Sequence, residues 1–90
     1  MKLKALIGKN VKYYRYRENL IQEQLAEKTK SSVNYIGRLE RGQHNPSVDK
    51  LEKVASALNI EPYELFIQRN DIDNLPVRVN LKPKKYHINY

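Results

Sequence analysis

Apolar residues in the central part of the chain are few and regularly spaced. Leu25 and Ala26 form one pair and Ile36 and Leu39 another, with mostly polar residues around them. Apolar residues three or four positions apart lie on one face of an α-helix. The pattern therefore predicts two short helices joined by a tight turn, each with one narrow buried stripe. The positions of the second helix that should face outward are Ser32, Val33, Asn34, Tyr35 and Arg38.

Helical spacing also organises the N-terminal segment. Leu3, Ile7, Val11 and Tyr14 recur on one face, and lysine and arginine occupy the other faces. This helix should end near Asn19, because asparagine tolerates the left-handed conformation that ends many helices. Its basic exterior is compatible with a solvated surface and with a path along a phosphate backbone.

The segment after Gly42 predicts two more helices. A polar loop leads to Pro46, and Ser47 is a suitable N-cap for a helix that ends near Asn59. Pro62 suits the first position of a last helix, where its missing N–H is harmless. The apolar residues that should bury these two helices are Leu51, Val54, Ala55, Leu58, Leu65 and Phe66.

The charge balance limits the classes of partner. Lysine and arginine outnumber aspartate and glutamate by 17 to 10, which gives a net charge of +7. Such a chain favours a polyanion, either nucleic acid or an anionic membrane surface. No membrane is expected, since no apolar run approaches the roughly 18 residues of a membrane span and the N-terminus lacks a signal peptide's apolar centre. The absence of cysteine fits a cytoplasmic protein.

The two central helices carry the marks of a known family. In order, the marks are Gln22, Leu25, Ala26, the run from Ile36 to Glu40, and Gly42. Together they resemble the helix-turn-helix of lambdoid-phage repressor and Cro proteins, the XRE-type family of small DNA-binding regulators. The resemblance extends from about Leu6 to Phe66.

This resemblance implies a fold and a function. The fold would be all-α, a five-helix repressor-like domain over residues 1–68 with an extension over residues 69–90. The function would be sequence-specific regulation of transcription, expected to be repression. A homodimer would bind double-stranded DNA, because this fold needs two copies to read a two-part operator. Neither a cofactor nor a metal is expected.

By the same resemblance, the helix over residues 32–41 enters the major groove. The candidate base contacts are Ser32, Val33, Asn34 and Arg38. Asparagine pairs with adenine, arginine pairs with guanine, and valine contacts a thymine methyl group. Ser32 fits a base contact and a helix cap equally well. The candidate phosphate contacts are Gln22, Tyr35, Arg41, Gln43, His44 and Lys50.

The resemblance further implies an ion pair between Arg15 and Glu40, which would hold the first helix to the end of the recognition helix. Two positions depart from the family pattern. Lys30 stands where most members have glycine, so a residue with a side chain is expected at positive φ. Ile21 stands where serine or threonine usually caps the helix. Both departures should lower the stability of the motif.

Period-two alternation marks the C-terminal extension. Apolar and polar residues alternate over residues 77–82 and 86–90, with Pro83 between the two runs. The alternation predicts two short strands that could form a hairpin. Because a lone hairpin is marginally stable in water, its apolar face needs cover from the helical domain or from a second copy. We expect a role in the homodimer; a disordered tail is the alternative.

An enzyme is not expected. His44 and His87 have no evident acid partner, cysteine is absent, and the three glycines form no phosphate-binding loop. Asp71 and Asp73 lack the rest of a metal-binding loop. The serious alternative is an antitoxin or other protein-interaction module that also binds its own operator, because seven tyrosines and a β-prone tail can form a binding surface.

Overall fold

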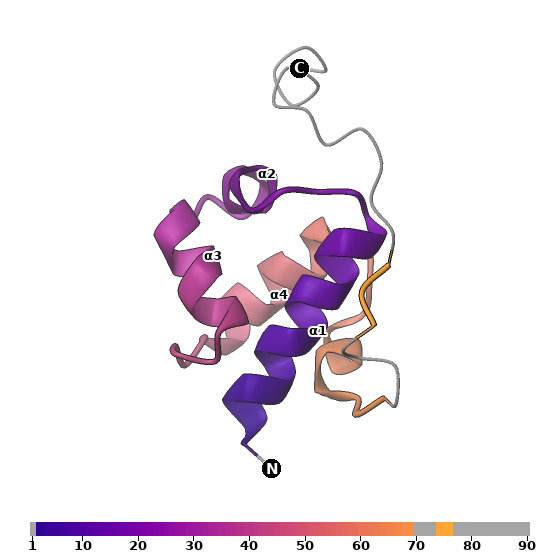
Figure 1. Cartoon of the computed structure of the whole chain (residues 1–90). Helices are drawn as coiled ribbons and strands as arrows, with labels where there is room; N and C mark the ends of the chain where they lie inside the picture. Colours follow the sequence, from indigo (N-terminus) through magenta and orange to yellow (C-terminus); the bar gives the residue numbers. More distant parts are fainter. Residues whose placement is uncertain (1, 70–73, 77–90) are drawn as a thin grey trace.

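Four α-helices followed by a short 3-10 helix make up the fold in the computed structural model, which describes residues 2–69 and 74–76 (Figure 1). They are α1 (Leu3–Arg17), α2 (Gln22–Lys28), α3 (Val33–Glu40), α4 (Val48–Ala57) and η1 (Pro62–Phe66). The all-α prediction is confirmed for the described residues, but the expected five α-helices are not, since the fifth element is a 3-10 helix. None of these helices is long and apolar enough to cross a membrane.

Most predictions for the C-terminal extension concern residues that the structure does not describe. The two predicted strands, at residues 77–82 and 86–90, lie outside the described residues, as do Asp71, Asp73 and His87. Within residues 2–69 and 74–76 the structure contains no strand. In that same part, no three histidine, aspartate or glutamate side chains gather as a metal ion would require.

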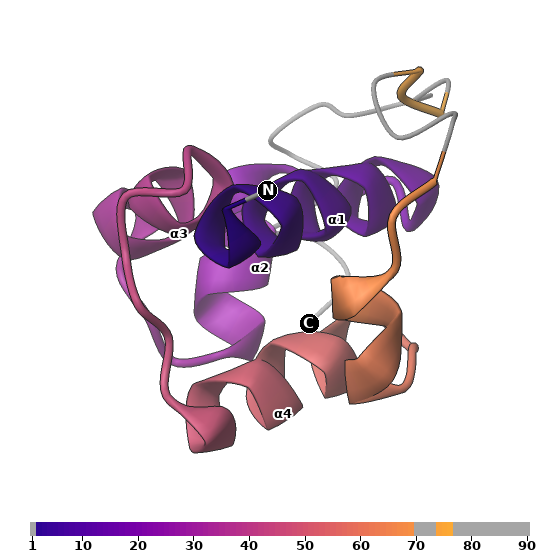
Figure 2. The same ribbon diagram turned by 90° about the horizontal axis from the view of Figure 1, so that it is seen from below.

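The helices enclose one core. In Figure 1, α1 crosses the middle of the fold, where it contacts α3 and η1. α2 packs against α3, and α4 closes the opposite side through contacts with η1 and α2 (Figure 2). The buried core residues are Ile7, Val11, Tyr14, Leu25, Ala26, Ile36, Leu39, Val54, Ala55, Leu58 and Leu65. All five elements contribute to this core, as their spacing predicted.

Helix ends follow the local signals in the sequence. Three residues with side chains adopt positive φ, namely Asn19 at 60°, Lys30 at 54° and Asn59 at 60°. The Ser47 hydroxyl caps α4 by accepting a hydrogen bond from the Lys50 amide at 3.1 Å. Ile21 supplies no side-chain cap to α2. Instead, Gln24 Oε1 accepts a hydrogen bond from the Ile21 amide at 2.8 Å, which satisfies one backbone donor at that end.

Two predicted core residues are exposed. Leu3 is 50% exposed because it is the first residue of α1, ahead of the point where the helix meets the core, and Leu6 is buried instead. Phe66 is 39% exposed, whereas its neighbour Leu65 is fully buried. With three residues per turn, successive side chains of a 3-10 helix point about 120° apart, so η1 can bury only one of the two.

The backbones of α1 and α3 approach closely. A Cβ atom at Gly8 would lie 2.5 Å from the carbonyl oxygen of Leu39 and 2.6 Å from that of Glu40. Only glycine therefore allows α1 to touch the last turn of α3. The turn after α3 also requires glycine, since Gly42 has φ of 72° and a Cβ there would lie 3.0 Å from the Cα atom of Ala5.

A buried asparagine joins α1 to the C-terminal side of the domain. Asn10 is fully buried, and its Nδ2 atom donates to the carbonyl oxygens of Leu65 at 2.8 Å and Ile67 at 3.0 Å. Arg69 Nη2 donates to Asn10 Oδ1 at 3.1 Å. The Arg69 guanidinium also lies 4.0 Å from the centre of the Tyr13 ring. Residues beyond η1 are thus tied to α1 as far as Arg69.

Candidate nucleic-acid interface

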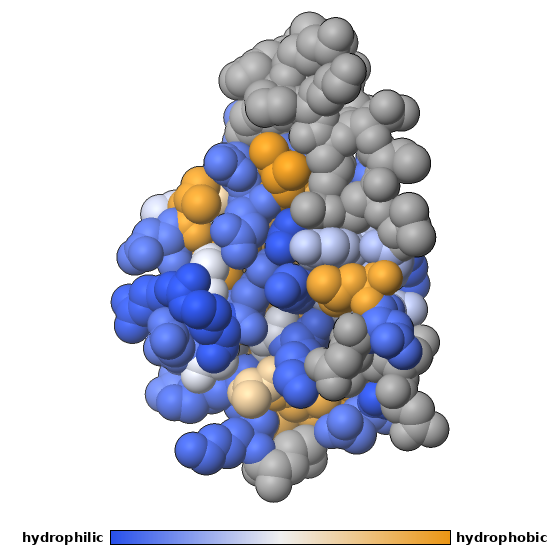
Figure 3. Space-filling model, viewed as in Figure 1, coloured by the Kyte–Doolittle hydropathy of each residue, from blue (hydrophilic) through white to orange (hydrophobic). Residues whose placement is uncertain are grey.

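α3 presents a polar face that the rest of the domain leaves open. Its buried residues are Ile36, Gly37 and Leu39, whereas Asn34 and Arg38 are exposed and Val33 is 41% exposed. Hydrophilic side chains dominate the surface in the region of α3 in Figure 3. The one buried stripe predicted from the spacing therefore faces α1 and α2, and the remaining positions face solvent.

The start of α3 is fixed by Ser32. Its hydroxyl oxygen accepts a hydrogen bond from the Tyr35 amide at 3.0 Å, and Ser32 itself is exposed. Of the two roles open to Ser32 in the sequence, the structure contains the cap. A base contact by the same residue stays a prediction.

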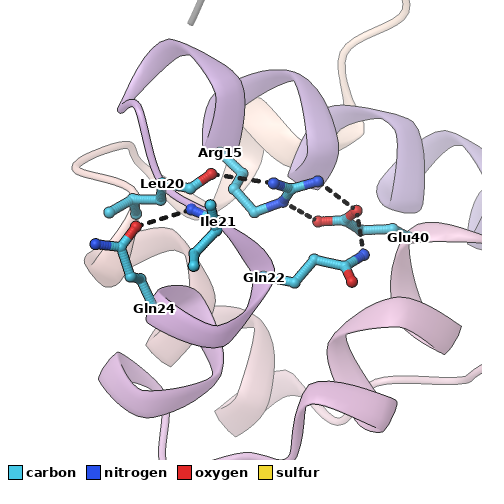
Figure 4. A network of polar contacts seen from close by, with 6 residues as sticks. All are labelled: Arg15, Leu20, Ile21, Gln22, Gln24 and Glu40. Carbon is cyan, nitrogen blue, oxygen red and sulfur yellow. Dashed lines mark hydrogen bonds and ion pairs between the residues drawn. The ribbon is translucent and has the colours of Figure 1, made fainter. Parts of the chain in front are cut away.

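Arg15 and Glu40 form the ion pair that the resemblance implied (Figure 4). The contact is bidentate, with Arg15 Nε 2.6 Å from Glu40 Oε2 and Arg15 Nη2 3.0 Å from Oε1, and both side chains are at most 5% exposed. Arg15 Nη1 also donates to the carbonyl oxygen of Leu20 at 3.0 Å. Gln22 Nε2 donates to Glu40 Oε1 at 3.1 Å. The pair thus joins α1, the start of α2 and the end of α3.

A second group of polar side chains gathers at the C-terminal end of α3. Arg41 Nε donates to Gln43 Oε1 at 3.2 Å, and Arg38 Nη2 lies 3.5 Å from the carbonyl oxygen of Gln43. A Cβ atom at Gly37 would lie 3.1 Å from Arg41 Nη1 and 3.9 Å from Gln22 Nε2. The Arg41 guanidinium therefore lies over Gly37, near Gln22. Gln22, Arg38, Arg41 and Gln43 share one surface.

Tyr35, His44 and Lys50 form a third group beside the start of α3. The rings of Tyr35 and His44 meet edge to face with centroids 4.6 Å apart, and Lys50 Nζ lies 5.2 Å from the centre of the Tyr35 ring. Lys50 Nζ donates to Ser31 Oγ at 2.8 Å. The Tyr35 hydroxyl oxygen is buried and has no hydrogen-bond partner among the described residues. Burial raises the pKa of Tyr35 above its ordinary value.

Replacing Tyr35 with phenylalanine should not destabilise the domain. Removing a buried hydroxyl without a partner should leave the free energy of unfolding at pH 7 unchanged or raise it by about 1 kcal/mol. Because the folded-state pKa is raised, the unfolded chain ionises first above pH 10.0 and the wild type then loses stability. The variant should lose less there. Urea unfolding at pH 7 and above pH 10.0 measures the free energy of unfolding of both proteins, with Tyr63→Phe as the exposed control. A clear loss for Tyr35→Phe at pH 7 would contradict the buried placement.

The structure brings together most of the residues that sequence reasoning selected, but it gives several of them partners that the sequence does not reveal. Gln22 binds Glu40, and Lys50 binds the turn before α3. The residues of that turn, Thr29 and Ser31, were missed. Their only sequence signal is a pair of hydroxyl side chains on either side of Lys30, which is typical of turns in general.

Comparison with known proteins agrees with this geometry. A family model described as helix-turn-helix matches residues 11–65. The immunity repressor protein of Bacillus phage phi105 is 35% identical over 79 residues, covering 88% of this chain and 55% of the phage protein. Control protein C.SmaI of Serratia marcescens is 42% identical over 69 residues, covering 77% of this chain and 82% of that protein.

Solved structures give the same result. The restriction-modification controller protein C.AhdI from Aeromonas hydrophila aligns with a TM-score of 0.68 and 40% identity, over 70% of this chain and 96% of that chain. The chain spans about half the length of some curated relatives that it matches, among them the phage repressor. The matched family model, the similar solved structure and the exposed face of α3 lead to one conclusion. The chain belongs to the helix-turn-helix family of the XRE or Cro/C1 type, which comprises DNA-binding regulators of transcription.

Proposed function

We propose that this protein represses transcription as a homodimer that inserts α3 into the major groove of double-stranded operator DNA. The observation that carries the proposal is the exposed polar face of α3, which includes Asn34 and Arg38 and is held in place by a buried ion pair at the end of the helix. An α-helix fits the major groove, where each base pair presents a distinct pattern of donors and acceptors.

Residues at the start of α3, together with Arg38 one turn further on, supply the base contacts in this proposal. Asn34 pairs with adenine and Arg38 with guanine, each through two hydrogen bonds. Val33, at 41% exposure, contacts a thymine methyl group. Ser32 keeps its capping bond and approaches the same groove from the first turn.

Gln22, Arg41, Gln43 and His44 supply the phosphate contacts. Tyr35, also predicted to contact a phosphate, is left out because its hydroxyl oxygen is buried. Gln22 lies at the N-terminus of α2, where free backbone N–H groups and the helix dipole favour an anionic oxygen. Arg41 and Gln43 are exposed and linked to each other, so they can approach the backbone as a unit. Such contacts fix the orientation of the protein on the duplex and carry no sequence information.

The homodimer is part of the same proposal. One domain reads one half-site, and a two-fold dimer reads two half-sites about 34 Å apart, one turn of B-DNA. The boundary near residue 68 and a role of residues 69–90 in the dimer remain proposals from the sequence. Relatives named immunity repressor and control protein favour a regulator over the antitoxin reading.

Selection of bound duplexes from random DNA tests the proposal. We expect an enriched half-site in an inverted repeat, with a centre-to-centre spacing of about one helical turn. Enrichment of a single, unrepeated half-site would contradict the dimer. Failure to bind any duplex at low salt would contradict DNA binding altogether.

Arg38 and Arg41 should respond differently to truncation. Arg38→Ala should weaken binding to the selected site by about 1 to 3 kcal/mol and relax the preference at one base pair. Arg41→Ala should weaken binding to all duplexes alike and reduce the slope of log affinity against log salt by about one. Fluorescence anisotropy with the selected site and with unrelated DNA at several salt concentrations measures both effects. If Arg38→Ala left base preference intact, the assigned reading face would be wrong.

A further inference from the structure

The turn between α2 and α3 contains an unfavourable backbone conformation. Lys30 has φ of 54°, a region that residues with a Cβ atom adopt at a cost in free energy. This turn sets the angle between α2 and α3. A strained turn keeps a single conformation only where surrounding contacts hold it.

Hydroxyl groups provide part of that support. Thr29 is 1% exposed, and its Oγ1 atom donates to the carbonyl oxygen of Leu25 at 2.8 Å. Ser31 Oγ lies 3.0 Å from Thr29 Oγ1, and the Ser31 amide donates to the carbonyl oxygen of Ala26 at 2.8 Å. Lys30 is therefore flanked by two residues that bond back to the last turn of α2.

Lys50, in α4, provides the rest of the support for this turn. It lies in the first turn of α4, and its Nζ atom donates to Ser31 Oγ at 2.8 Å and lies 3.4 Å from the carbonyl oxygen of Thr29. Thr29 is the C-cap of α2, where a carbonyl oxygen lacks a partner within the helix and attracts a cation. The same ammonium lies 5.2 Å from the centre of the Tyr35 ring, within the range of a cation–π contact.

We infer that Lys50 is a positioning residue that fixes the angle of the recognition helix by holding the α2–α3 turn against α4, an inference that rests on the proposed function. Its ammonium contacts the end of α2, the middle of the turn and the first turn of α3. Lys50 therefore connects α2, the turn and α3 to α4. In the proposed complex, the relative placement of these elements decides where α3 meets the bases.

This role differs from the phosphate contact predicted for Lys50 from the sequence. An ammonium group has three N–H donors, and the two oxygens at 2.8 and 3.4 Å lie within the protein. Two of the three donors are thus engaged inside the protein, and a phosphate would have to take the third or replace one of the two oxygens. A positioning residue affects the specific site more than unrelated DNA, whereas a phosphate contact affects both equally.

Two variants and one control separate these roles in the free protein. Lys50→Met keeps most of the side-chain length and removes the donors, and Ser31→Ala removes the acceptor and leaves the charge. Lys53→Met is the matched control, since Lys53 is an exposed lysine on the same helix. Hydrogen exchange measured by NMR on the free protein, relative to the intrinsic rate of each residue, should be faster on the order of tenfold at the amides of residues 31 and 36 in both variants. The control should match the wild type.

DNA binding provides the second measurement. Lys50→Met should weaken binding to the selected site about tenfold more than to an unrelated duplex, with the salt slope unchanged. Equal weakening on both duplexes with a slope lower by about 0.9, and unchanged amide exchange, would make Lys50 a phosphate contact and overturn the inference. If the wild type binds no duplex, the proposed function fails, while the exchange rates still decide whether Lys50 holds the turn.

Discussion

Replacing Arg15 with methionine should lower the free energy of unfolding by about 3 to 5 kcal/mol. The substitution leaves the Glu40 carboxylate, in a side chain that is 4% exposed, without its bidentate partner and with the Gln22 side-chain amide as its one remaining donor among the described residues. The Leu20 carbonyl oxygen loses a donor as well. Domains of this size have total stabilities of about 5 to 15 kcal/mol, so the loss removes a large part of the total. Urea denaturation followed by circular dichroism measures it.

A second substitution separates the ion pair from simple loss of packing. Combining Arg15→Met with Glu40→Leu removes both charges, and replacement of a buried pair by apolar side chains is often neutral or stabilising. The double variant should therefore recover most of the stability that the single variant loses. A loss below about 1 kcal/mol in Arg15→Met alone would indicate that the pair behaves like a solvent-exposed one.

Gly8→Ala should destabilise the domain by about 1 to 3 kcal/mol or more. The added methyl group would lie 2.5 and 2.6 Å from two backbone carbonyl oxygens of α3, and backbone cannot rotate away as a side chain can. Relief requires α1 and α3 to separate, which also strains the Arg15 and Glu40 contact. Thermal and urea unfolding measure the loss.

Gly37→Ala is the matched control for this prediction. Gly37 also lies within a helix, but a methyl group there meets only the end of the Arg41 side chain, at 3.1 Å. That side chain can move, and alanine favours a helix by about 1 kcal/mol relative to glycine, so stability should rise or stay level. Equal destabilisation by both substitutions would contradict the asymmetric contacts of the two glycines.

Residues with a strong local signal were predictable from the sequence. The existence of α2 and α3 and their buried faces follow from two apolar pairs, and Ser47 is an N-cap because its hydroxyl reaches an amide three residues away. Such features depend on residues close together in the chain. Positive φ at Lys30 was expected from the resemblance, because most family members have glycine at that position, and the structure confirms it. The contact of Arg15 with Glu40 is long-range and was available only through resemblance to a family.

The remaining features depend on how separate elements meet. The buried hydroxyl of Tyr35 and the contacts of Lys50 arise where α3, α4 and the turn between α2 and α3 meet, and no periodicity in the sequence encodes that meeting. Leu3 was assigned to the core because it continues the spacing of α1, but helical spacing does not tell how far along a helix the core extends. The close approach of Gly8 to α3 likewise depends on tertiary packing.

The contacts of Arg69 affect where an expression fragment of this domain should stop. A fragment ending at residue 68 would lose the guanidinium that donates to Asn10 and stacks on Tyr13. The oxygen of a fully buried amide would then lose that charged donor, and two rings of α1, Tyr13 and Tyr14, would lose their contact with the guanidinium. Truncations meant to isolate the helical part should therefore retain Arg69, one residue beyond the boundary that the sequence pattern suggests.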